Sequence, residues 1–357
     1  MFEEDHAPVT LSEIYHQAAS CQRTIALAQD RSSVFNRFQP LDSYTDIILT
    51  GCGSSHHLAI CASFALSEML QRPVSSVASS ELAHFPDHYF SRNARPFVIA
   101  ISRSGDTTEV RLAVERLQAD YVASSIALTT EGNEVAHVCD AGIVFDECVE
   151  RSVVMTHAFT CMLVGLYRAG DDFSGGRRAE EIRQLPRLIA DALLKTEQAV
   201  RSIAEDQSIS RFFFLGSGPM KGLADECALK ITEMALDTAL SYRTLEFRHG
   251  PKATLNASDQ VIIFPVEAEM PYIDDLVSEI ARIGARVLVV APQSIKFSDS
   301  RVSSLNICSD DNPLRGDNLL PAFYAHFGQL LAYWRAAARD LNPDAPRHLA
   351  RTVLLNV

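Results

Sequence analysis

The sequence predicts an α/β protein built from two tandem, doubly wound parallel sheets, each flavodoxin-like and covered by helices on both faces as three α/β/α layers. Continuous apolar runs of strand length, such as residues 261–264 and 287–290, alternate with amphipathic helical segments, which is typical of parallel strands buried on both faces. The order of strand, glycine turn, helix and strand occurs twice, with equivalent landmarks roughly 160 residues apart. We therefore expect a duplicated domain.

The first predicted domain covers residues 41–176. A glycine turn containing Gly51 and Gly53 follows its first strand, and a turn rich in hydroxyls, residues 102–107, follows a later one. The expected strands cover residues 46–50, 97–102, 125–129 and 141–145, and the expected helices cover residues 57–70 and 108–119. Ligands of open parallel sheets bind at the carboxyl ends of strands, so these turns are the first candidates for a site.

The second predicted domain covers residues 207–341 and repeats this plan after a turn at residues 216–218. Its expected strands cover residues 211–215, 261–266, 286–290 and 304–308, and its first helix covers residues 220–236. A linking helix is expected within residues 177–206, interrupted only at Pro186. The N-terminal helical segment, residues 1–40, is predicted to start near Leu11 with Thr10 as its N-cap. The tail, residues 342–357, is expected to fold over another part of the chain.

Composition excludes several classes of function. The 357 residues include 32 basic and 45 acidic side chains, a net charge of −13, which argues against nucleic acid or an anionic membrane as partner. The acidic start does not resemble a signal peptide, and the apolar runs are too short to cross a bilayer, so we expect a cytoplasmic protein without a membrane span. The 8 cysteines form no C-x-x-C pair and indicate reduced thiols.

Cofactor motifs are incomplete in this sequence. The segment Gly51-Cys52-Gly53 resembles the opening of a dinucleotide fingerprint, but His56 occupies the position of its third glycine. The phosphate-binding loop signature of nucleotide hydrolases is absent. The histidines at positions 56, 57, 84 and 88 lack the spacing that a metal site needs. We therefore expect neither a cofactor nor a metal ion.

The turn at residues 102–107 is the stronger candidate for an anion site. Ser102, Ser104 and Thr107 place three hydroxyls, with Arg103, in a strand-to-helix turn whose backbone N–H groups favour a phosphate. The alternative is a helix N-cap, in which Ser104 or Thr107 satisfies the first amides of the following helix. The combination of two serine-containing turns favours the phosphate site.

The second half carries ionisable groups in place of such a turn. Lys230 and Glu233 are three residues apart on one predicted helix and share a face. By composition alone such a pair is more often a solvated surface pair than a catalytic one. His249 precedes a Gly-Pro turn, and its role is ambiguous at this stage.

Five segments of the chain form a set of motifs in register: Gly51-Cys52-Gly53-Ser54-Ser55, Ile101-Ser102-Arg103-Ser104-Gly105-Asp106-Thr107, residues 152–159, Ala228-Leu229-Lys230-Ile231-Thr232-Glu233 and Phe247-Arg248-His249-Gly250-Pro251. This set resembles the tandem sugar isomerase (SIS) domain family, from about residue 40 onward. Within that family it is similar to the isomerase half of glucosamine-6-phosphate synthase and to the branch of amino-sugar-phosphate deaminases and tagatose-6-phosphate ketose-aldose isomerases.

The resemblance implies a role for each of these segments. Glu233 would shuttle a proton between C1 and C2 of a sugar phosphate, with Lys230 beside it. His249 would assist ring opening from the partner subunit, which implies a homodimer. Arg351 stands where the synthase has a lysine, and we hypothesise that it stabilises negative charge on the enediolate oxygen. The residues implied to surround the substrate and its phosphate are Cys52, Gly53, Ser54, Ser55, Ser102, Arg103, Ser104, Thr107, Val153 and Ala350.

The expected activity is conversion of a 2-amino-2-deoxyhexose 6-phosphate, glucosamine or galactosamine 6-phosphate, to a ketose 6-phosphate and ammonia. The alternatives are an aldose/ketose 6-phosphate isomerase, a fructosamine-6-phosphate deglycase and a sugar-phosphate sensor without catalysis. Residue 2 is Phe, and no segment resembling the synthase's glutaminase half precedes the repeat, which favours deamination or isomerisation over nitrogen transfer from an amide.

Overall fold

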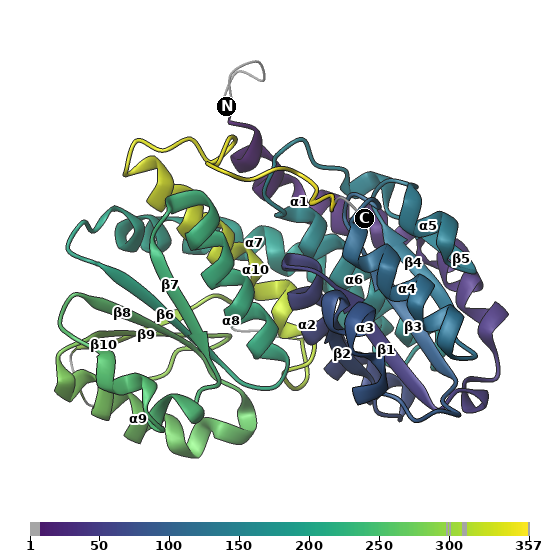
Figure 1. Cartoon of the computed structure of the whole chain (residues 1–357). Helices are drawn as coiled ribbons and strands as arrows, with labels where there is room; N and C mark the ends of the chain where they lie inside the picture. Colours follow the sequence, from purple (N-terminus) through teal and green to yellow (C-terminus); the bar gives the residue numbers. More distant parts are fainter. Residues whose placement is uncertain (1–7, 298, 300, 309–312, 356–357) are drawn as a thin grey trace. The chain divides into compact units, whose positions relative to one another are not determined.

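The computed structural model describes residues 8–297, 299, 301–308 and 313–355, which fall into two compact units (Figure 1). Among the described residues, the N-terminal unit comprises His16–Arg183 and residues 350–355. The C-terminal unit comprises residues 8–15 and the described residues between Gln184 and Leu349. Two 27-residue helices, α1 (Val9–Phe35) and α7 (Ala179–Glu205), each contribute residues to both units.

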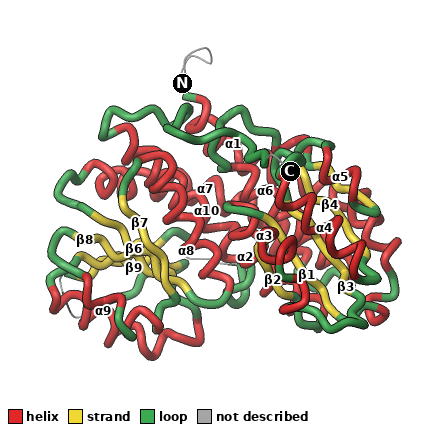
Figure 2. The backbone as a smooth tube through the Cα atoms, in the orientation of Figure 1, coloured by secondary structure: helices red, strands yellow, loops and turns green. Residues whose placement is uncertain are grey.

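A five-stranded parallel sheet forms the centre of the N-terminal unit, with the order β2-β1-β3-β4-β5 (Figure 2). This is the flavodoxin-like order, and the strand order reverses between β1 and β3, where such sheets bind ligands. The strands are β1 (Asp46–Gly51), β2 (Ser75–Ala78), β3 (Pro96–Ile101), β4 (Ser124–Thr129) and β5 (Ala141–Val144). The predicted parallel sheet of the first half is confirmed.

Helices cover both faces of this sheet because its strands are apolar on both sides. Ile48 and Val98 pack with Leu117 of α4 on one face, whereas Ile47 and Ile99 point the other way. On that second face α2 packs against α6. The helices are α2 (Ser54–Leu70), α3 (Ser79–His84), α4 (Thr108–Asp120), α5 (Glu134–Val138) and α6 (His157–Phe173).

The C-terminal unit has a second five-stranded parallel sheet, with the order β10-β9-β8-β6-β7. Read from its other edge, this is the order of the first sheet, so β6 and β8 correspond to β1 and β3. The strands are β6 (Arg211–Gly216), β7 (Thr238–Tyr242), β8 (Asp259–Phe264), β9 (Arg286–Ala291) and β10 (Val302–Asn306). The two halves of the chain therefore share one topology.

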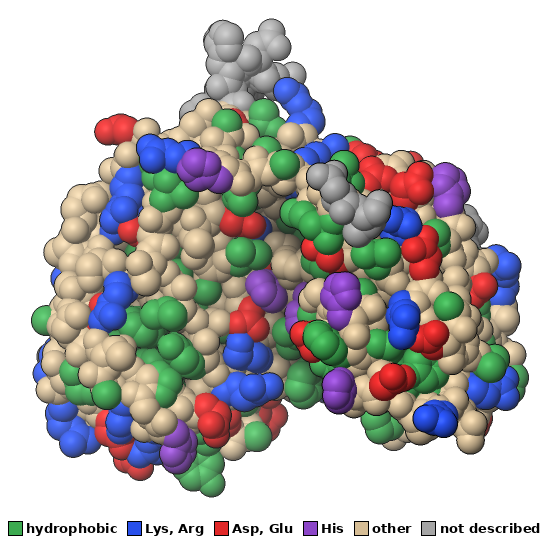
Figure 3. Space-filling model, in the orientation of Figure 1, with side chains coloured by type: hydrophobic (Ala, Val, Ile, Leu, Met, Phe, Trp, Pro, Cys, Tyr) green, Lys and Arg blue, Asp and Glu red, His purple; other side chains and the backbone are tan. Residues whose placement is uncertain are grey.

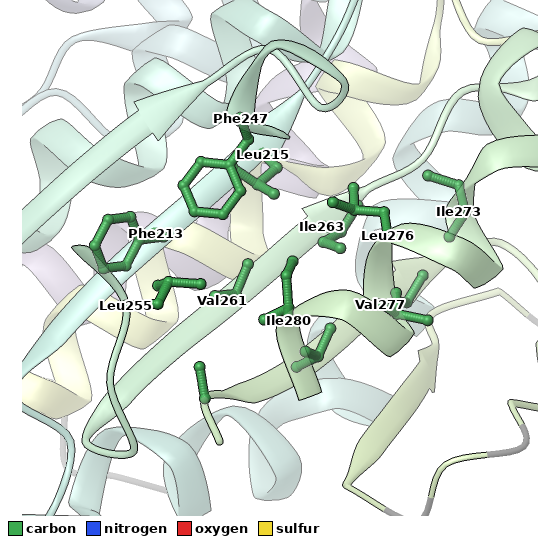
Figure 4. Close-up of a cluster of buried hydrophobic side chains, with 13 residues drawn as sticks. Phe213, Leu215, Phe247, Leu255, Val261, Ile263, Ile273, Leu276, Val277 and Ile280 are labelled. Atoms are coloured by element: carbon green, nitrogen blue, oxygen red, sulfur yellow. The ribbon is translucent and has the colours of Figure 1, made fainter. Parts of the chain in front are cut away.

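The core of the C-terminal unit consists of apolar side chains from both faces of this sheet. Figure 4 shows one cluster, in which Phe213 and Val261 of the sheet lie near Ile280 of α9. On the other face, the Phe264 ring packs edge-on against Phe327 of α10, with ring centroids 5.9 Å apart. The helices, with one π-helical turn, are α8 (Pro219–Lys230), η5 (Ile231–Ala235), α9 (Met270–Ile283) and α10 (Leu320–Ala337).

The duplication extends to the glycine turns. Gly53 has φ 52° and ψ −127°, and Gly218 has φ 56° and ψ −130°. Both lie in a region that favours glycine, because a Cβ atom disfavours positive φ. The same backbone conformation therefore joins the first strand to the first helix in each unit.

The structure differs from the sequence-based expectations in several places. The linking helix expected to be interrupted at Pro186 is the continuous helix α7, and the last strand covers Val302–Asn306 and not residues 304–308. The strands β2 and β7 were not predicted. The helix expected over residues 220–236 changes to a π-helical turn after Lys230. The N-terminal helix starts at Val9, and its first amides donate to the Asp344 carboxylate, from Val9 at 2.9 Å and from Thr10 at 2.7 Å, so the cap is Asp344 and not Thr10.

Three properties that the sequence suggested concern the surface charge, the cysteines and membrane spans, and each can be compared with the described residues. On the face shown in Figure 3, Lys and Arg side chains are interspersed with Asp and Glu. All 8 cysteines are free thiols, including Cys21 and Cys161, whose sulfur atoms are 3.5 Å apart. None of the described helices has the length and apolarity that crossing a membrane requires.

Candidate functional site

The hydroxyl-rich turn of the N-terminal unit lies at the carboxyl end of β3, beside the point where the strand order reverses. Ser102 and Ser104 are buried, with exposures of 1% and 5%, and Thr107 is half-buried. Thr107 is the N-cap residue of α4, but its side chain makes no capping hydrogen bond. Its hydroxyl lies 2.8 Å from that of Ser102 instead, so the alternative of an ordinary side-chain N-cap at Thr107 does not hold.

Backbone amides of the turn orient the two serine hydroxyls. The Gly105 amide donates to Ser102 Oγ at 3.1 Å, and the Asp106 amide donates to Ser104 Oγ at 3.2 Å. A hydroxyl that accepts a hydrogen bond still has its own proton to donate. Ser104 therefore retains a donor, and the Ser102 and Thr107 pair retains another, which suits an anion.

Arg103 has a different environment from the one expected for a phosphate ligand. Its buried guanidinium donates to the Val153 carbonyl at 2.8 Å and to the Arg351 carbonyl at 2.9 Å. A salt bridge of 3.3 Å joins it to Glu150. These bonds direct Arg103 into the protein, and a direct bond from its guanidinium to phosphate stays a prediction.

The glycine turn after β1 supplies the second set of predicted residues. Gly53 is exposed and precedes α2, whose first residues, Ser54 and Ser55, are buried. Cys52 is half-buried, and burial, followed by the charge of Glu109, raises the pKa of its thiol to about 11. Cys52 is therefore a neutral thiol near neutral pH, which excludes a thiolate nucleophile at this position.

The end of the C-terminal tail, residues 350–355, belongs to the N-terminal unit. Besides the Arg103 contact to the Arg351 carbonyl, the Leu355 amide donates to Thr108 Oγ1 at 3.1 Å. The Arg351 side chain pairs with Glu131 at 2.7 Å, and Ala350 is exposed. The expectation that the tail folds over another part of the chain is confirmed for these residues, which cover the start of α4.

Lys230 and Glu233 lie together in the C-terminal unit. The Lys230 ammonium is 2.6 Å from a Glu233 carboxylate oxygen and 3.4 Å from Glu226. Lys230 is 1% exposed, whereas the Glu233 side chain is 20% exposed. The pair is therefore not the solvated surface pair of the alternative interpretation. One carboxylate reaches the surface beside a buried cation.

The π-helical turn decides how Glu233 is presented. The turn Ile231–Ala235 interrupts the α-helical spacing directly after Lys230, and such turns are frequent at functional sites. It ends at Leu236, which has φ 53°. Ile231, Met234 and Ala235 are buried in this turn and anchor it, so Glu233 has a defined position.

His249 lies at the end of a short 3-10 helix, Glu246–Arg248, and is exposed. Its neighbour Phe247 is buried in the core cluster of this unit (Figure 4). This anchor places the His249 backbone, while the imidazole is accessible in a single chain.

Sequence reasoning missed two buried carboxylates beside these groups, Glu150 and Glu226. Their side chains are 0% and 3% exposed, respectively. No sequence signal identifies either as buried, because each occurs among ordinary polar residues. Their places in the sequence are the only link to the predicted site. Glu150 lies shortly before the motif at residues 152–159, and Glu226 lies four residues before Lys230.

Neither a metal-binding cluster nor the cavity beside β8 and β9 of the C-terminal unit involves the predicted site residues that the structure describes. Among the described residues, no group of three or more His, Cys, Asp or Glu side chains could hold a metal ion. A cavity of about 250 Å³ opens at the carboxyl ends of β8 and β9, between residues such as Val266, Gln293 and Leu320. None of the predicted catalytic or phosphate-binding residues lines it.

Comparison with known proteins finds one family model and several relatives that are similar to this chain. Residues 42–167 match the model of the SIS domain. The chain is 28% identical over 362 residues to a glutamine–fructose-6-phosphate aminotransferase (isomerizing) of Caulobacter vibrioides, with 96% of this chain and 58% of that relative covered. A Thermococcus kodakarensis protein of the same name is 27% identical, with 96% and 57% covered. The chain thus spans somewhat more than half of these relatives.

Solved structures match the chain over nearly its whole length. The glucosamine-6-phosphate deaminase structure of Thermotoga maritima has a TM-score of 0.79 and 28% identity, and the match covers 97% of this chain and 99% of that one. The tagatose-6-phosphate ketose/aldose isomerase of Escherichia coli has a TM-score of 0.85 at 22% identity, covering 99% of each. The second likeness concerns the fold alone.

Proposed function

We propose that this chain, whose residues 42–167 match the SIS domain model, is a phosphosugar isomerase that deaminates a 2-amino-2-deoxyhexose 6-phosphate. The products are a ketose 6-phosphate and ammonia. The proposal assigns phosphate binding to the turns of the N-terminal unit and proton transfer to Glu233 of the C-terminal unit. Glucosamine and galactosamine 6-phosphate are the candidate substrates.

One observation carries the proposal: a half-buried carboxylate is held beside a buried ammonium on a π-helical turn. The Glu233 carboxylate is accessible as a proton acceptor, and the Lys230 ammonium lies 2.6 Å from one of its oxygens. The oriented hydroxyls of Ser102, Ser104 and Thr107 support the phosphate assignment independently. A 28% identical structure of a glucosamine-6-phosphate deaminase, matched over nearly its full length, supports deamination in particular.

The chemistry follows from the acidity of the C2 hydrogen in the ring-opened substrate. Glu233 removes that proton, the C2–H electron pair forms the C1=C2 double bond of an enediol-type intermediate, and the C1 carbonyl oxygen takes up a proton. The same carboxylate then returns its proton to C1. When C2 bears an amine, the nitrogen gives up a proton in this second step, and the product is a 2-imine. Water then adds to the C=N carbon, and nitrogen leaves as ammonia. A positioned base of this kind typically contributes 10²–10⁴-fold to the rate.

The decisive experiment is a panel of hexosamine and hexose 6-phosphates with separate assays for ammonia and ketose, using wild type and Glu233→Gln. We expect ammonia and ketose in equal amounts from the wild type, and a loss of about 100-fold or more in kcat for the variant. Glu205→Gln is the matched control, because this exposed side chain pairs with Arg201 in the same unit and is not among the predicted site residues.

Each alternative predicts a different result in this panel. Ketose without ammonia from a hexose phosphate identifies a plain isomerase, and release of a free amine or amino acid from a fructosamine 6-phosphate identifies a deglycase. Binding without turnover of any compound identifies a sensor. Turnover that Glu233→Gln leaves unchanged contradicts the assignment of the base.

We further propose that His249 acts in the site of a partner subunit in a homodimer. Its exposure in the single chain supports this role. If each site combines Glu233 of one chain with His249 of the other, co-expressing Glu233→Gln and His249→Ala chains restores part of the activity that each variant alone lacks. Mixed dimers that stay inactive contradict the shared site.

Arg351 is proposed to stabilise the enediolate. Its side chain pairs with Glu131 at 2.7 Å and is 34% exposed, so the guanidinium is partly neutralised but accessible. Arg351→Ala is expected to lower kcat and Arg351→Lys to change it modestly, because both cations provide positive charge. Full activity in Arg351→Ala contradicts this role.

A further inference from the structure

We propose that Glu150 is a positioning residue of the phosphate site: it fixes Arg103, and Arg103 in turn holds together the three chain segments that surround the hydroxyl turn. This inference rests on the proposed function, because it concerns the same phosphate site. In this proposal Glu150 and Arg103 position the turn, and the hydroxyls and backbone N–H groups of the turn contact the phosphate.

The Glu150 carboxylate is fully buried and uses both oxygens. Oε1 accepts from the Thr156 amide at 2.7 Å, from the Thr156 hydroxyl at 2.9 Å and from the Ala158 amide at 3.1 Å. Oε2 accepts from Arg103 at 3.3 Å. The first three bonds fix the start of α6, and the fourth connects that helix to the turn after β3.

Arg103 extends this connection to two more segments. One of its terminal nitrogens donates both to the Val153 carbonyl, in the loop before α6, and to the Arg351 carbonyl, in the C-terminal tail. The Arg103 carbonyl also accepts from the Thr130 amide at 3.0 Å and the Thr130 hydroxyl at 2.8 Å. The residue is thus held by side chain and backbone together, directly between Ser102 and Ser104.

Charge supports this arrangement. Burial by itself raises the pKa of the Glu150 carboxyl, but the charges of His157 and Arg103 and two backbone amides hold it below its usual value. Glu150 is therefore ionised near neutral pH. A buried guanidinium is costly unless it is paired, and this carboxylate is its partner. The Arg103 guanidinium is therefore paired with a carboxylate of the protein whether or not phosphate is bound.

Loss of the Glu150 charge is therefore expected to make the turn at residues 102–107 less well positioned, although none of its hydroxyls is changed. Glu150→Gln keeps the side-chain size and one oxygen acceptor for α6, but removes the charge-assisted bond to Arg103. Ser102 and Ser104 flank Arg103, so their hydroxyls lose their fixed direction. Binding of the phosphate is weakened, while proton transfer at Glu233 in the other unit is not directly affected.

The test compares Glu150→Gln with Glu147→Gln. The control residue is a buried carboxylate three positions earlier that pairs with Arg31 at 2.6 Å and has no bond to the turn. Fructose 6-phosphate binding is measured by titration calorimetry, and KM and kcat are measured with the best substrate of the panel. We expect the dissociation constant and KM to rise about 10- to 100-fold in Glu150→Gln, with kcat within about threefold of wild type.

The outcomes separate this inference from the proposed function. Both variants are expected to lose some thermal stability, but only Glu150→Gln is expected to lose affinity. Equal affinity losses in the two variants, or unchanged affinity in Glu150→Gln, overturn the positioning role while leaving the proposed function intact. Wild type that binds fructose 6-phosphate without turnover contradicts the proposed activity and still allows the affinity comparison. Wild type that binds no sugar phosphate overturns both.

A second variant covers the case in which Glu150→Gln does not fold. Arg103→Lys keeps the positive charge beside Glu150. It lacks the planar guanidinium that donates to the carbonyls of Val153 and Arg351. If Arg103 positions the turn through Val153 and Arg351, this variant also raises KM with little change in kcat. If Arg103→Lys retains wild-type affinity, the bridging role is contradicted.

Discussion

Protonation of His326 is expected to weaken the C-terminal unit at mildly acidic pH. The imidazole lies on α10 with 0% exposure. Its Nδ1 donates to the Phe323 carbonyl at 2.8 Å, and its Nε2 lies 3.2 Å from the Thr196 hydroxyl of α7. Burial lowers the pKa of His326 from 6.5 to about 4, with the Phe323 hydrogen bond opposing the shift. The folded state therefore holds this histidine in its neutral form.

The size of the effect follows from linkage between protonation and folding. The unfolded chain binds the proton near pH 6.5, and the folded chain binds it only near pH 4, so the stabilising contribution is complete above about pH 6.5 and is lost as pH falls toward 4. The full difference corresponds to about 3 kcal/mol. At pH 5 the expected loss is about 2 kcal/mol, whereas at pH 7.5 it is close to zero.

The single tryptophan makes this measurable in the right part of the molecule. Trp334 lies on α10, the helix that carries His326, so its fluorescence reports urea unfolding of this unit. Other groups also titrate at low pH, so the informative quantity is the difference between wild type and His326→Leu at each pH. Wild type is expected to lose about 2 kcal/mol more than the variant between pH 7.5 and pH 5. An equal loss in both proteins refutes the reasoning.

Three further predictions concern packing and capping in the C-terminal unit. Gly328→Ala is expected to lower the free energy of unfolding in urea by about 1–3 kcal/mol, because the added Cβ would lie against the Cys227 sulfur and 3.1 Å from the Cys227 Cα. Cys227 lies on the helix that leads to Glu233, so kcat is expected to fall as well; an undisturbed Tm contradicts this. Arg335→Met is expected to cost about 3–5 kcal/mol in the same assay, because it removes the 2.7 Å partner of buried Asp237, which then has Arg339 as its ion partner, and removes the donor to the carbonyls of Ala204, Asp206 and Ile209. A loss below about 1 kcal/mol is inconsistent with these contacts. Asp344→Ala is expected to cost about 1 kcal/mol and to speed amide exchange in the first turn of α1, and unchanged exchange there means that the carboxylate is not the cap.

The fold was predictable wherever strands are apolar on both faces. The strands around residues 46–51, 96–101, 211–216 and 259–264 are central and almost wholly buried, and each was expected from its apolar run. The two missed strands, β2 and β7, are edge strands in equivalent positions, with mostly half-exposed residues. Position at an edge alone does not explain this, because the edge strands β5 and β10 were expected. The segments Ser75–Ala78 and Thr238–Tyr242 consist largely of small or polar residues and so lack the continuous apolar signal.

The position of the candidate phosphate site was predictable where a turn follows a strand. Ser102, Ser104 and Thr107 were placed correctly at the carboxyl end of β3, because a hydroxyl-rich strand-to-helix turn has a local signature. The surroundings of Arg103 were not predictable, since its partners Glu150 and Arg351 lie 47 and 248 residues away in the chain. Contacts over such separations depend on how the whole unit packs.

By itself, the sequence determined that this protein has two parallel sheets in two similar halves. It also determined that the hydroxyl turn lies in the first half and the lysine–glutamate pair in the second. These features follow from local patterns of apolar residues, glycine and hydroxyls, which act over a few residues. Only the tertiary structure decided that Lys230 is buried, that a π-helical turn presents Glu233, and that Arg103 faces a buried carboxylate. Burial and charge pairing depend on distant segments that meet only in the folded chain.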